Sequence, residues 1–392
     1  MDAKSAPAIK RRPWATVALA LWTVALTVLL TRAGLQPHRL SSLATYLNGG
    51  AAWQTSSPLY TDWRGFVYPP VIAWFFSILR DLPLTLAAVL WRALTAGTFL
   101  FGLGALLRSG VFRRIPPGSR GLVFIAVLPL SIGNIDNAQA NPLIAGLMML
   151  AVAAFQTESW TLCAFAAAVS IAFKIYPVAL ALLLCLLRPK QLSWRIALIL
   201  LLLALVPFAL QDVHYVSAQY HAWLQTRLAD DRFHYPMKDA PLDLWYLLVR
   251  LGNLPVSVRL YEAVQVIAGI ALAALVWVRS RRGVSIADNL AVLYLLVSVW
   301  MLLLGPATEN QTYVVLAPAA ALLAIQTIYS GSRSSRILAF AAYGFLLAAV
   351  CRNSLIPSLK SPAFMAIQPI GALILLAAIS CELRAATPAS PR

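Results

Sequence analysis

Apolar runs recur along the chain from residue 14 to residue 382, and only short charged or polar segments separate them. Hydrophobic residues make up 60% of the 392 residues and charged residues only 11%. A water-soluble fold of this length cannot bury so much apolar surface, so most of it must face lipid. No small-residue cleavage site follows the first run, residues 14–31, which favours a retained span over a removed signal peptide. The sequence therefore predicts an all-α polytopic membrane protein.

The net charge of +17 comes from basic residues that cluster between the apolar runs. These clusters lie at residues 4–12, 108–120, 188–195, 279–282 and 333–336. Lysine and arginine in short loops mark the cytoplasmic side of a membrane protein. We therefore expect these segments in the cytoplasm, and no nucleic-acid partner. The cysteines lie in or beside apolar runs at unrelated spacings, which is typical of buried small side chains rather than of a disulfide framework or a metal site.

The basic segments also fix how many runs can cross the membrane. Runs 14–31, 66–79 and 84–107 lie between two segments expected on the same side, so one of the three cannot span. A span needs about 20 residues, and the run 66–79 is too short, so we expect it to be a re-entrant or juxtamembrane piece of an external loop at about 32–83.

Continuing this count gives about twelve spans in a single transmembrane domain, residues 1–392. We expect both termini in the cytoplasm, a second external polar loop at about 211–253, and a location in the plasma membrane. Four short runs between residues 121 and 187 should surround a water-filled cavity, because their ends cannot all meet lipid.

Most acidic residues fall on the predicted external segments. Asp136 and Glu309 are flanked by apolar runs, where an unpaired carboxylate is costly and marks a candidate functional site. Lys174 is embedded in the same way, and its role is open between pairing with a carboxylate, reaching toward the membrane surface and binding a ligand. Amides crowd around Asp136, where they can bind sugar hydroxyls or a phosphate, or cap two short helices: Asn134, Asn137, Gln139 and Asn141.

No cofactor site is evident in the sequence. The neighbouring Asp230 and Asp231 could bind a divalent cation, although paired surface aspartates are more often simply solvated. The histidines of the 211–253 loop have no metal-ligand spacing, and no glycine-rich phosphate loop follows a strand. A divalent cation therefore stays possible, without a defined metal site.

Five segments in order resemble glycosyltransferase family 87. They read "PLYTDWRGFVYPP", "GNIDNAQANPLIAGLMML", "AFKIYPVALALLLCLLRPK", "DAPLDLWYLLVRL" and "LGPATENQTYVVLAP". The first is similar to a family loop with an F-x-Y-P-P motif, the second to a G-Q-x-N-x-L segment, and the third to a K-x-x-P helix. The last two are similar to an N-Q-S-L … R element and to a late S-P … Y … P segment.

The resemblance implies a GT-C fold and transfer of a hexose, typically mannose, from a polyprenyl-phosphate donor to a lipid or glycan acceptor on the external face. It implies a single inverting displacement, with an aspartate of the first external loop as general base within reach of the acceptor hydroxyl. Cationic and amide groups should hold the leaving phosphate, whose charge grows in the transition state.

The sequence departs from the family at that base. The family's aspartate stands four positions before a tyrosine, and the matching stretch "SLATY" has Ser42 before Tyr46. Asp62, Asp136 or Glu309 could supply the base instead. Alternatively, the chain is a catalytically inactive lipid-glycan binding protein. A transporter is the rival class, but it would need polar groups at the midplane and a repeat.

The remaining predicted site residues bind donor or substrate. They are Arg64, Tyr68, Asn137, Gln139, Asn141, Lys174, Tyr176, His221 and Arg250.

Overall fold

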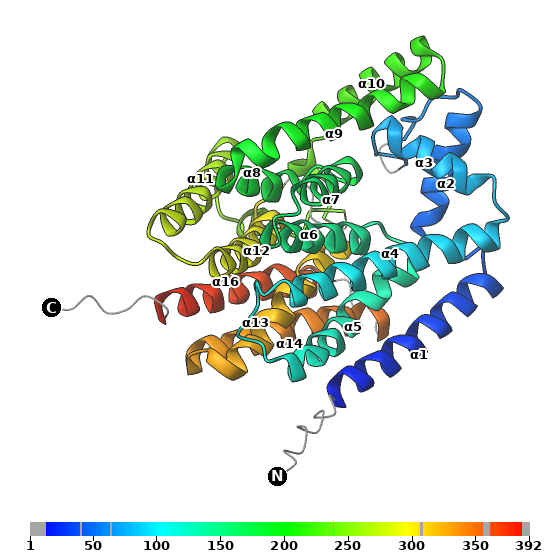
Figure 1. Cartoon of the computed structure of the whole chain (residues 1–392). Helices are drawn as coiled ribbons and strands as arrows, with labels where there is room; N and C mark the ends of the chain where they lie inside the picture. The colour runs from blue at the N-terminus through cyan, green and yellow to red at the C-terminus, as the bar shows by residue number, and fades with distance from the viewer. Residues whose placement is uncertain are drawn as a thin grey trace.

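The computed structural model describes residues 13–39, 41–62, 65–237, 239–305, 309–355 and 361–385. Helices form all the regular structure of these residues (Figure 1), which confirms the predicted all-α class. The first half contains α1 (Pro13–Leu35), α2 (Ser42–Gln54), α3 (Pro70–Arg80), α4 (Leu84–Arg108), α5 (Arg120–Asp136), α6 (Asn141–Gln156), α7 (Trp160–Phe173), α8 (Val178–Leu187) and α9 (Pro189–Leu210). The second half contains α10 (Val213–Leu228), α11 (Val258–Arg281), α12 (Ile286–Leu303), α13 (Ala317–Ser330), α14 (Arg333–Leu355), α15 (Pro362–Met365) and α16 (Ile367–Ala385).

Within the described residues, nine helical segments are long and apolar enough to cross a membrane. They begin at Pro13, Leu84, Pro117, Pro189, Val258, Ile286, Asn310, Arg333 and Pro362. Three further predicted spans are the shorter helices α6, α7 and α8, with 16, 14 and 10 residues. The short helix α6 is buried along almost its whole length. Glycines allow it to touch α4, because a Cβ atom on Gly102 would lie 2.0 Å from the carbonyl oxygen of Gly146.

The helices α1 and α5 run in the same direction. At their first turns the backbones touch, since a Cβ atom on Gly121 would lie 2.3 Å from the carbonyl carbon of Trp14. At their other ends, Arg32 and Arg39 pair with Asp136 at 3.3 and 2.7 Å. One crossing in the opposite direction is therefore needed between α1 and α5 in the chain, and α4 provides it. The helix α3, with 11 residues, does not cross. This agrees with the prediction that the run 66–79 does not span.

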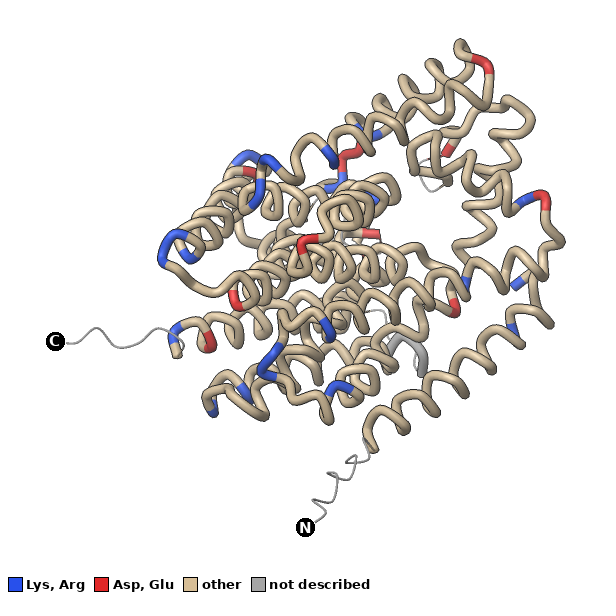
Figure 2. The backbone as a smooth tube through the Cα atoms, viewed as in Figure 1, with Lys and Arg blue, Asp and Glu red and all other residues tan. Residues whose placement is uncertain are grey.

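Positive charge gathers at one end of the bundle. Figure 2 shows most lysines and arginines at the end opposite to α2, α3 and α10. We call this the basic end and the opposite one the site end. The basic end holds the segments 108–120, 188–195, 279–282 and 333–336.

Two helices of the site end lie in segments that the sequence analysis described only as external loops. The helix α2 packs against α3 so closely that a Cβ atom on Gly50 would lie 2.6 Å from the backbone of Phe76. The helix α10 begins at the N-cap Asp212, whose carboxylate accepts a hydrogen bond from the N–H of Tyr215 at 2.9 Å. Both helices contribute residues to the wall of one cavity, α2 with Ser42, Thr45 and Tyr46 and α10 with Arg227.

Candidate active site

The site end contains a cavity of about 500 Å³, which we call the cationic cavity. Its walls come from the start of α2, the segment before α3, the break between α7 and α8, and the segments 227–242 and 309–311. The charged residues that line it are Lys174, Arg227, Asp230, Arg232, Asp239 and Glu309. Its volume is typical of a site for a small ligand.

Lys174 lies where α7 ends and the chain is extended for one residue before α8 begins. Among the described residues, no carboxylate lies within salt-bridge distance of its ammonium group, so pairing with a carboxylate does not explain this lysine. Two guanidinium groups line the same cavity, and the Nε atoms of Arg227 and Arg232 are buried without a hydrogen-bond partner in the described part of the chain. Buried donors of this kind are costly unless a ligand completes them.

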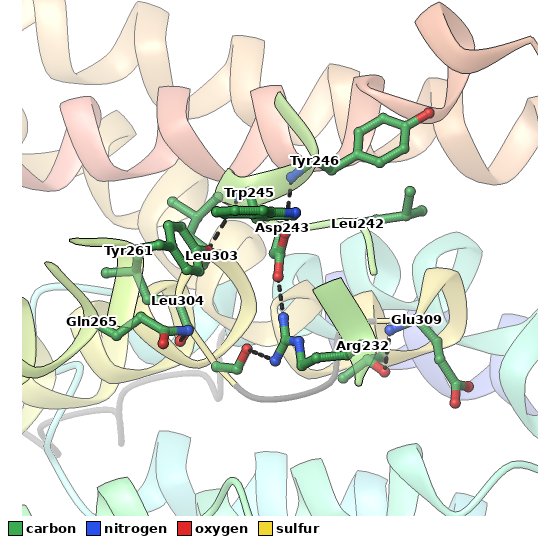
Figure 3. Close-up of polar contacts among 12 residues, drawn as sticks. Arg232, Leu242, Asp243, Trp245, Tyr246, Tyr261, Gln265, Leu303, Leu304 and Glu309 are labelled. Carbon is green, nitrogen blue, oxygen red and sulfur yellow. Dashed lines mark hydrogen bonds and ion pairs between the residues drawn. The ribbon is translucent and has the colours of Figure 1, made fainter. Parts of the chain in front are cut away.

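Arg232 ties the loop 229–245 to the end of α12 (Figure 3). One terminal nitrogen pairs with the fully buried Asp243, and the other donates to the carbonyl of Gly305 at 2.6 Å. Asp243 also accepts a hydrogen bond from the N–H of Tyr246 at 3.0 Å. Burial raises the pKa of Asp243 to about 6, and the positive charge of Arg232 opposes this shift.

Side chains from other segments satisfy the last carbonyls of α12, which have no partner within the helix. Tyr261 donates to the carbonyl of Leu303 at 3.1 Å, and Gln265 donates to that of Leu304 at 2.6 Å. Because Arg232 donates to the carbonyl of Gly305, the three successive carbonyls of residues 303–305 all accept a side-chain hydrogen bond. The chain that leads toward Glu309 is therefore anchored on its N-terminal side.

Glu309 stands at the start of the 3₁₀-helix Asn310–Val315 and forms a capping box with Thr312. Its carboxylate points away from the Arg232–Asp243 pair in Figure 3 and lines the cationic cavity. Burial raises the pKa of Tyr68 and Tyr176 well above that of free tyrosine, and the charge of nearby Glu309 raises it further. These phenols therefore stay protonated at neutral pH, and their hydroxyl groups donate to Tyr46 and to Asn141.

Ser42 lies in the wall of the cationic cavity, at the first residue of α2. Its hydroxyl accepts hydrogen bonds from Gln139 at 2.6 Å and from Asn137 at 3.5 Å. One turn later, the hydroxyl of Tyr46 accepts from Tyr68 at 3.2 Å. The segment "SLATY" thus reaches the cavity, but it brings a hydroxyl where the family resemblance implies a carboxylate.

Asp136 lines a second cavity of about 390 Å³, with Asn137 and with Asn310 and Gln311, which line both cavities. One oxygen of its carboxylate carries the ion pairs with Arg32 and Arg39. Gln139 lines the cationic cavity, whereas Asn141 is fully buried and accepts a hydrogen bond from Tyr176 at 3.3 Å. The amide cluster of the sequence analysis is therefore split between two cavities and the core.

The other predicted residues have different places. Asp62 is exposed and is not among the lining residues of either cavity, and Arg64 lies outside the described residues. His221 bonds Gln225 on the exposed surface of α10 at 2.8 Å. Arg250 donates to the carbonyl of Tyr235 at 2.8 Å and thereby holds the loop that carries Arg232.

Several residues that line the cavity were not among the predicted site residues, among them Arg232, Tyr235 and Asp239. They lie in the polar segment 211–253, where charged side chains are expected in any external loop, so the sequence gave no reason to prefer them. Asp230 accepts from Tyr235 and pairs with Arg227, whereas Asp231 pairs with His234. The two aspartates therefore turn to different partners, which does not favour a shared cation.

Comparison with known proteins supports a glycosyltransferase. Similar solved structures include ArnT from Cupriavidus metallidurans in the apo state, with 16% identity, a TM-score of 0.44, and coverage of 95% of this chain and 78% of that chain. The same protein bound to undecaprenyl phosphate has 15% identity, a TM-score of 0.40, and coverage of 94% and 76%. No curated protein matches the chain. The family model of glycosyltransferase family 87 matches residues 66–306, more than half of the sequence. The chain therefore belongs to glycosyltransferase family 87.

Proposed function

We propose that this membrane glycosyltransferase transfers a hexose, mannose by family resemblance, from a polyprenyl-phosphate donor to a lipid or glycan acceptor. The observation that carries the proposal is the gathering of three cationic side chains in one cavity: Arg227, Arg232 and Lys174, the last of which has no carboxylate within salt-bridge distance among the described residues. A phosphate oxygen accepts hydrogen bonds from such side chains strongly, because the acceptor is charged. The donors would stabilise the negative charge that the leaving phosphate gains.

The chemistry is a single displacement at the anomeric carbon. The acceptor oxygen forms the new bond while the bond to the phosphate oxygen breaks, and the phosphate leaves with the electron pair. Glu309 takes the proton of the acceptor hydroxyl. Among Asp62, Asp136 and Glu309, it is the one that lines the cationic cavity, and no ion pair neutralises it among the described residues. The configuration of the sugar is inverted.

The proposed active face is the external one, in the plasma membrane. The lining of the cationic cavity includes residues at the start of α2 and before α3, and these two helices lie opposite to the basic segments that we assign to the cytoplasm (Figure 2). A long polyprenyl chain can stay in the bilayer while its phosphate reaches the cavity. In this orientation both termini are cytoplasmic.

The test is the discharge of polyprenyl-phosphate [¹⁴C]mannose by the purified full chain in nanodiscs. We expect the wild type to release polyprenyl phosphate and to label a co-purifying lipid or glycan. Lys174→Ala should weaken binding of polyprenyl phosphate about 10- to 100-fold, the worth of a hydrogen bond to a charged group. Lys190→Ala, on the exposed start of α9, is the control. Equal binding by both variants would refute the phosphate site.

A second function is favoured by one observation, the hydroxyl of Ser42 in place of a carboxylate. The chain would then bind lipid-linked sugars without transferring them. Ser42→Asp restores the family's residue, and under our proposal it should not raise turnover, since Glu309 already supplies the base. A wild type that binds the donor but turns it over only after Ser42→Asp would favour the binding protein.

A further inference from the structure

The second cavity, beside Asp136, has a different chemical character from the cationic one. Its lining contains amides, one carboxylate and an apolar wall formed by Leu130 on α5 with Leu346 and Val350 on α14. Its one lining carboxylate, Asp136, is paired with two arginines outside the lining. We call it the amide cavity.

Two amide oxygens in the wall of the amide cavity lack hydrogen-bond partners. The Oδ1 atom of Asn134 and the Oε1 atom of Gln368 are buried without a partner in the described part of the chain. Gln368 is only 3% exposed. The orientation of its amide is fixed, because its Nε2 atom donates to the carbonyl of Asn310 at 3.2 Å. Both unpaired groups are acceptors, so their natural partner is a neutral hydroxyl group rather than a phosphate.

The two cavities meet at a shared wall. Asn310 and Gln311 line both of them, and Asn137 of the amide cavity donates to Ser42 of the cationic cavity. Glu309 immediately precedes this wall. A hydroxyl bound in the amide cavity would therefore lie across this wall from the cavity that Glu309 lines.

We propose that the amide cavity is the acceptor site, and that the acceptor is a neutral polyhydroxylated headgroup with an apolar chain. The oxygens of Asn134 and Gln368 accept hydrogen bonds from its hydroxyl groups, and the apolar part lies against Leu346 and Val350. The inference rests on the proposed transferase function, but it makes its own claim about binding. A cavity of about 390 Å³ is large enough for one small polar headgroup.

The test measures binding directly and needs no turnover. Butyl α-mannoside serves as the neutral probe and butyl phosphate as the anionic one, each titrated by NMR against the full chain in nanodiscs. We expect the mannoside to bind, and Gln368→Leu and Asn134→Leu each to weaken it about three- to tenfold, the worth of one neutral hydrogen bond. Butyl phosphate should not displace it.

A second pair of variants distinguishes loss of the binding site from loss of folding. Val350→Phe fills the cavity from its apolar side without touching the amides, and should also weaken the mannoside. Ala348→Phe, on the exposed face of the same helix, is the matched control and should bind it normally. Equal mannoside affinity in all variants, or tighter binding of butyl phosphate at the same place, would overturn the acceptor site.

The same samples separate this inference from the proposed function. Lys174→Ala should lose polyprenyl phosphate and keep butyl α-mannoside. If Lys174→Ala instead binds polyprenyl phosphate normally while the cavity variants still lose the mannoside, the donor proposal fails and the polyol site stands.

Discussion

The cationic cavity and the amide cavity share a wall, yet they differ in which of their polar groups have no hydrogen-bond partner. In the cationic cavity the buried side-chain atoms without a partner, in the described part of the chain, are donors, the Nε–H groups of Arg227 and Arg232, and Lys174 lines the same cavity. In the amide cavity the buried side-chain atoms without a partner, among the described residues, are acceptors, the oxygens of Asn134 and Gln368. The first cavity therefore offers hydrogen-bond donors to a phosphate, and the second offers amide oxygens to hydroxyl groups, which are the two partners that a transfer from a phosphate to an alcohol must bring together.

The carboxylates Asp136 and Glu309 of the two cavities differ in whether they form ion pairs with other described residues. Asp136 is paired with Arg32 and Arg39, whereas Glu309 faces a cavity among protonated tyrosines. The first carboxylate is engaged by two arginines, and the second is the one that we propose accepts the proton of the acceptor hydroxyl. The predictions below separate these roles.

The largest effect should come from the base. Glu309→Gln keeps the capping-box geometry and removes the basic oxygen, so turnover of polyprenyl-phosphate mannose should fall about 10²- to 10⁴-fold. Binding of polyprenyl phosphate should be retained, as measured by titration. Asp136→Asn is the matched variant in the amide cavity and should keep far more activity. A reversal of the two results would move the base to Asp136.

The next effect concerns the support of the cationic cavity. Asp243→Ala leaves the buried guanidinium of Arg232 without its carboxylate, and such a loss costs about 3–5 kcal/mol. Thermal unfolding in detergent should show a large decrease in the melting temperature. The control is Asp231→Ala, because Asp231 pairs with His234 on the surface and exposed pairs contribute little. Similar melting temperatures for the two variants would contradict a stabilising role of the Arg232–Asp243 pair.

A smaller effect distinguishes two arginines that both lie near the cationic cavity. Arg227→Gln removes a guanidinium whose Nε–H is unpaired in the cavity wall, so the dissociation constant for polyprenyl phosphate should rise about tenfold. Arg250→Gln removes hydrogen bonds to loop carbonyls instead, and should change that constant by less. A stronger effect of Arg250→Gln would return Arg250 to the donor-binding residues.

The smallest effect is expected at Asp62, which is exposed and outside the lining of both cavities. Asp62→Asn should change turnover by less than about threefold, well below the 10²-fold loss typical of a general base. The same discharge assay measures it. A loss as large as that of Glu309→Gln would show that the loop 55–69 brings Asp62 to the substrate.

The site was only partly predictable from the sequence. Lys174 and Glu309 stood out, because a charge between long apolar runs needs a reason, and both residues line the cationic cavity. Arg232 did not stand out, because it is one of many charged residues in a polar segment. Only the fold brings it between Asp243 and Gly305. Asn137 and Gln139 were predicted as one cluster, but a turn directs them into different cavities.

The sequence by itself determined that the protein lies in a membrane, that it is helical and which family it belongs to. Apolar runs in a membrane must be helices, since no water satisfies their backbone groups. The basic segments predicted an even number of crossings between the starts of α1 and α5, and these two helices do run in the same direction. The tertiary structure alone decided which carboxylates are neutralised and which polar groups stay unpaired. These properties depend on contacts such as Arg39 with Asp136, 97 residues apart. Burial and pairing over such separations are set by packing, and no local pattern of the sequence records them.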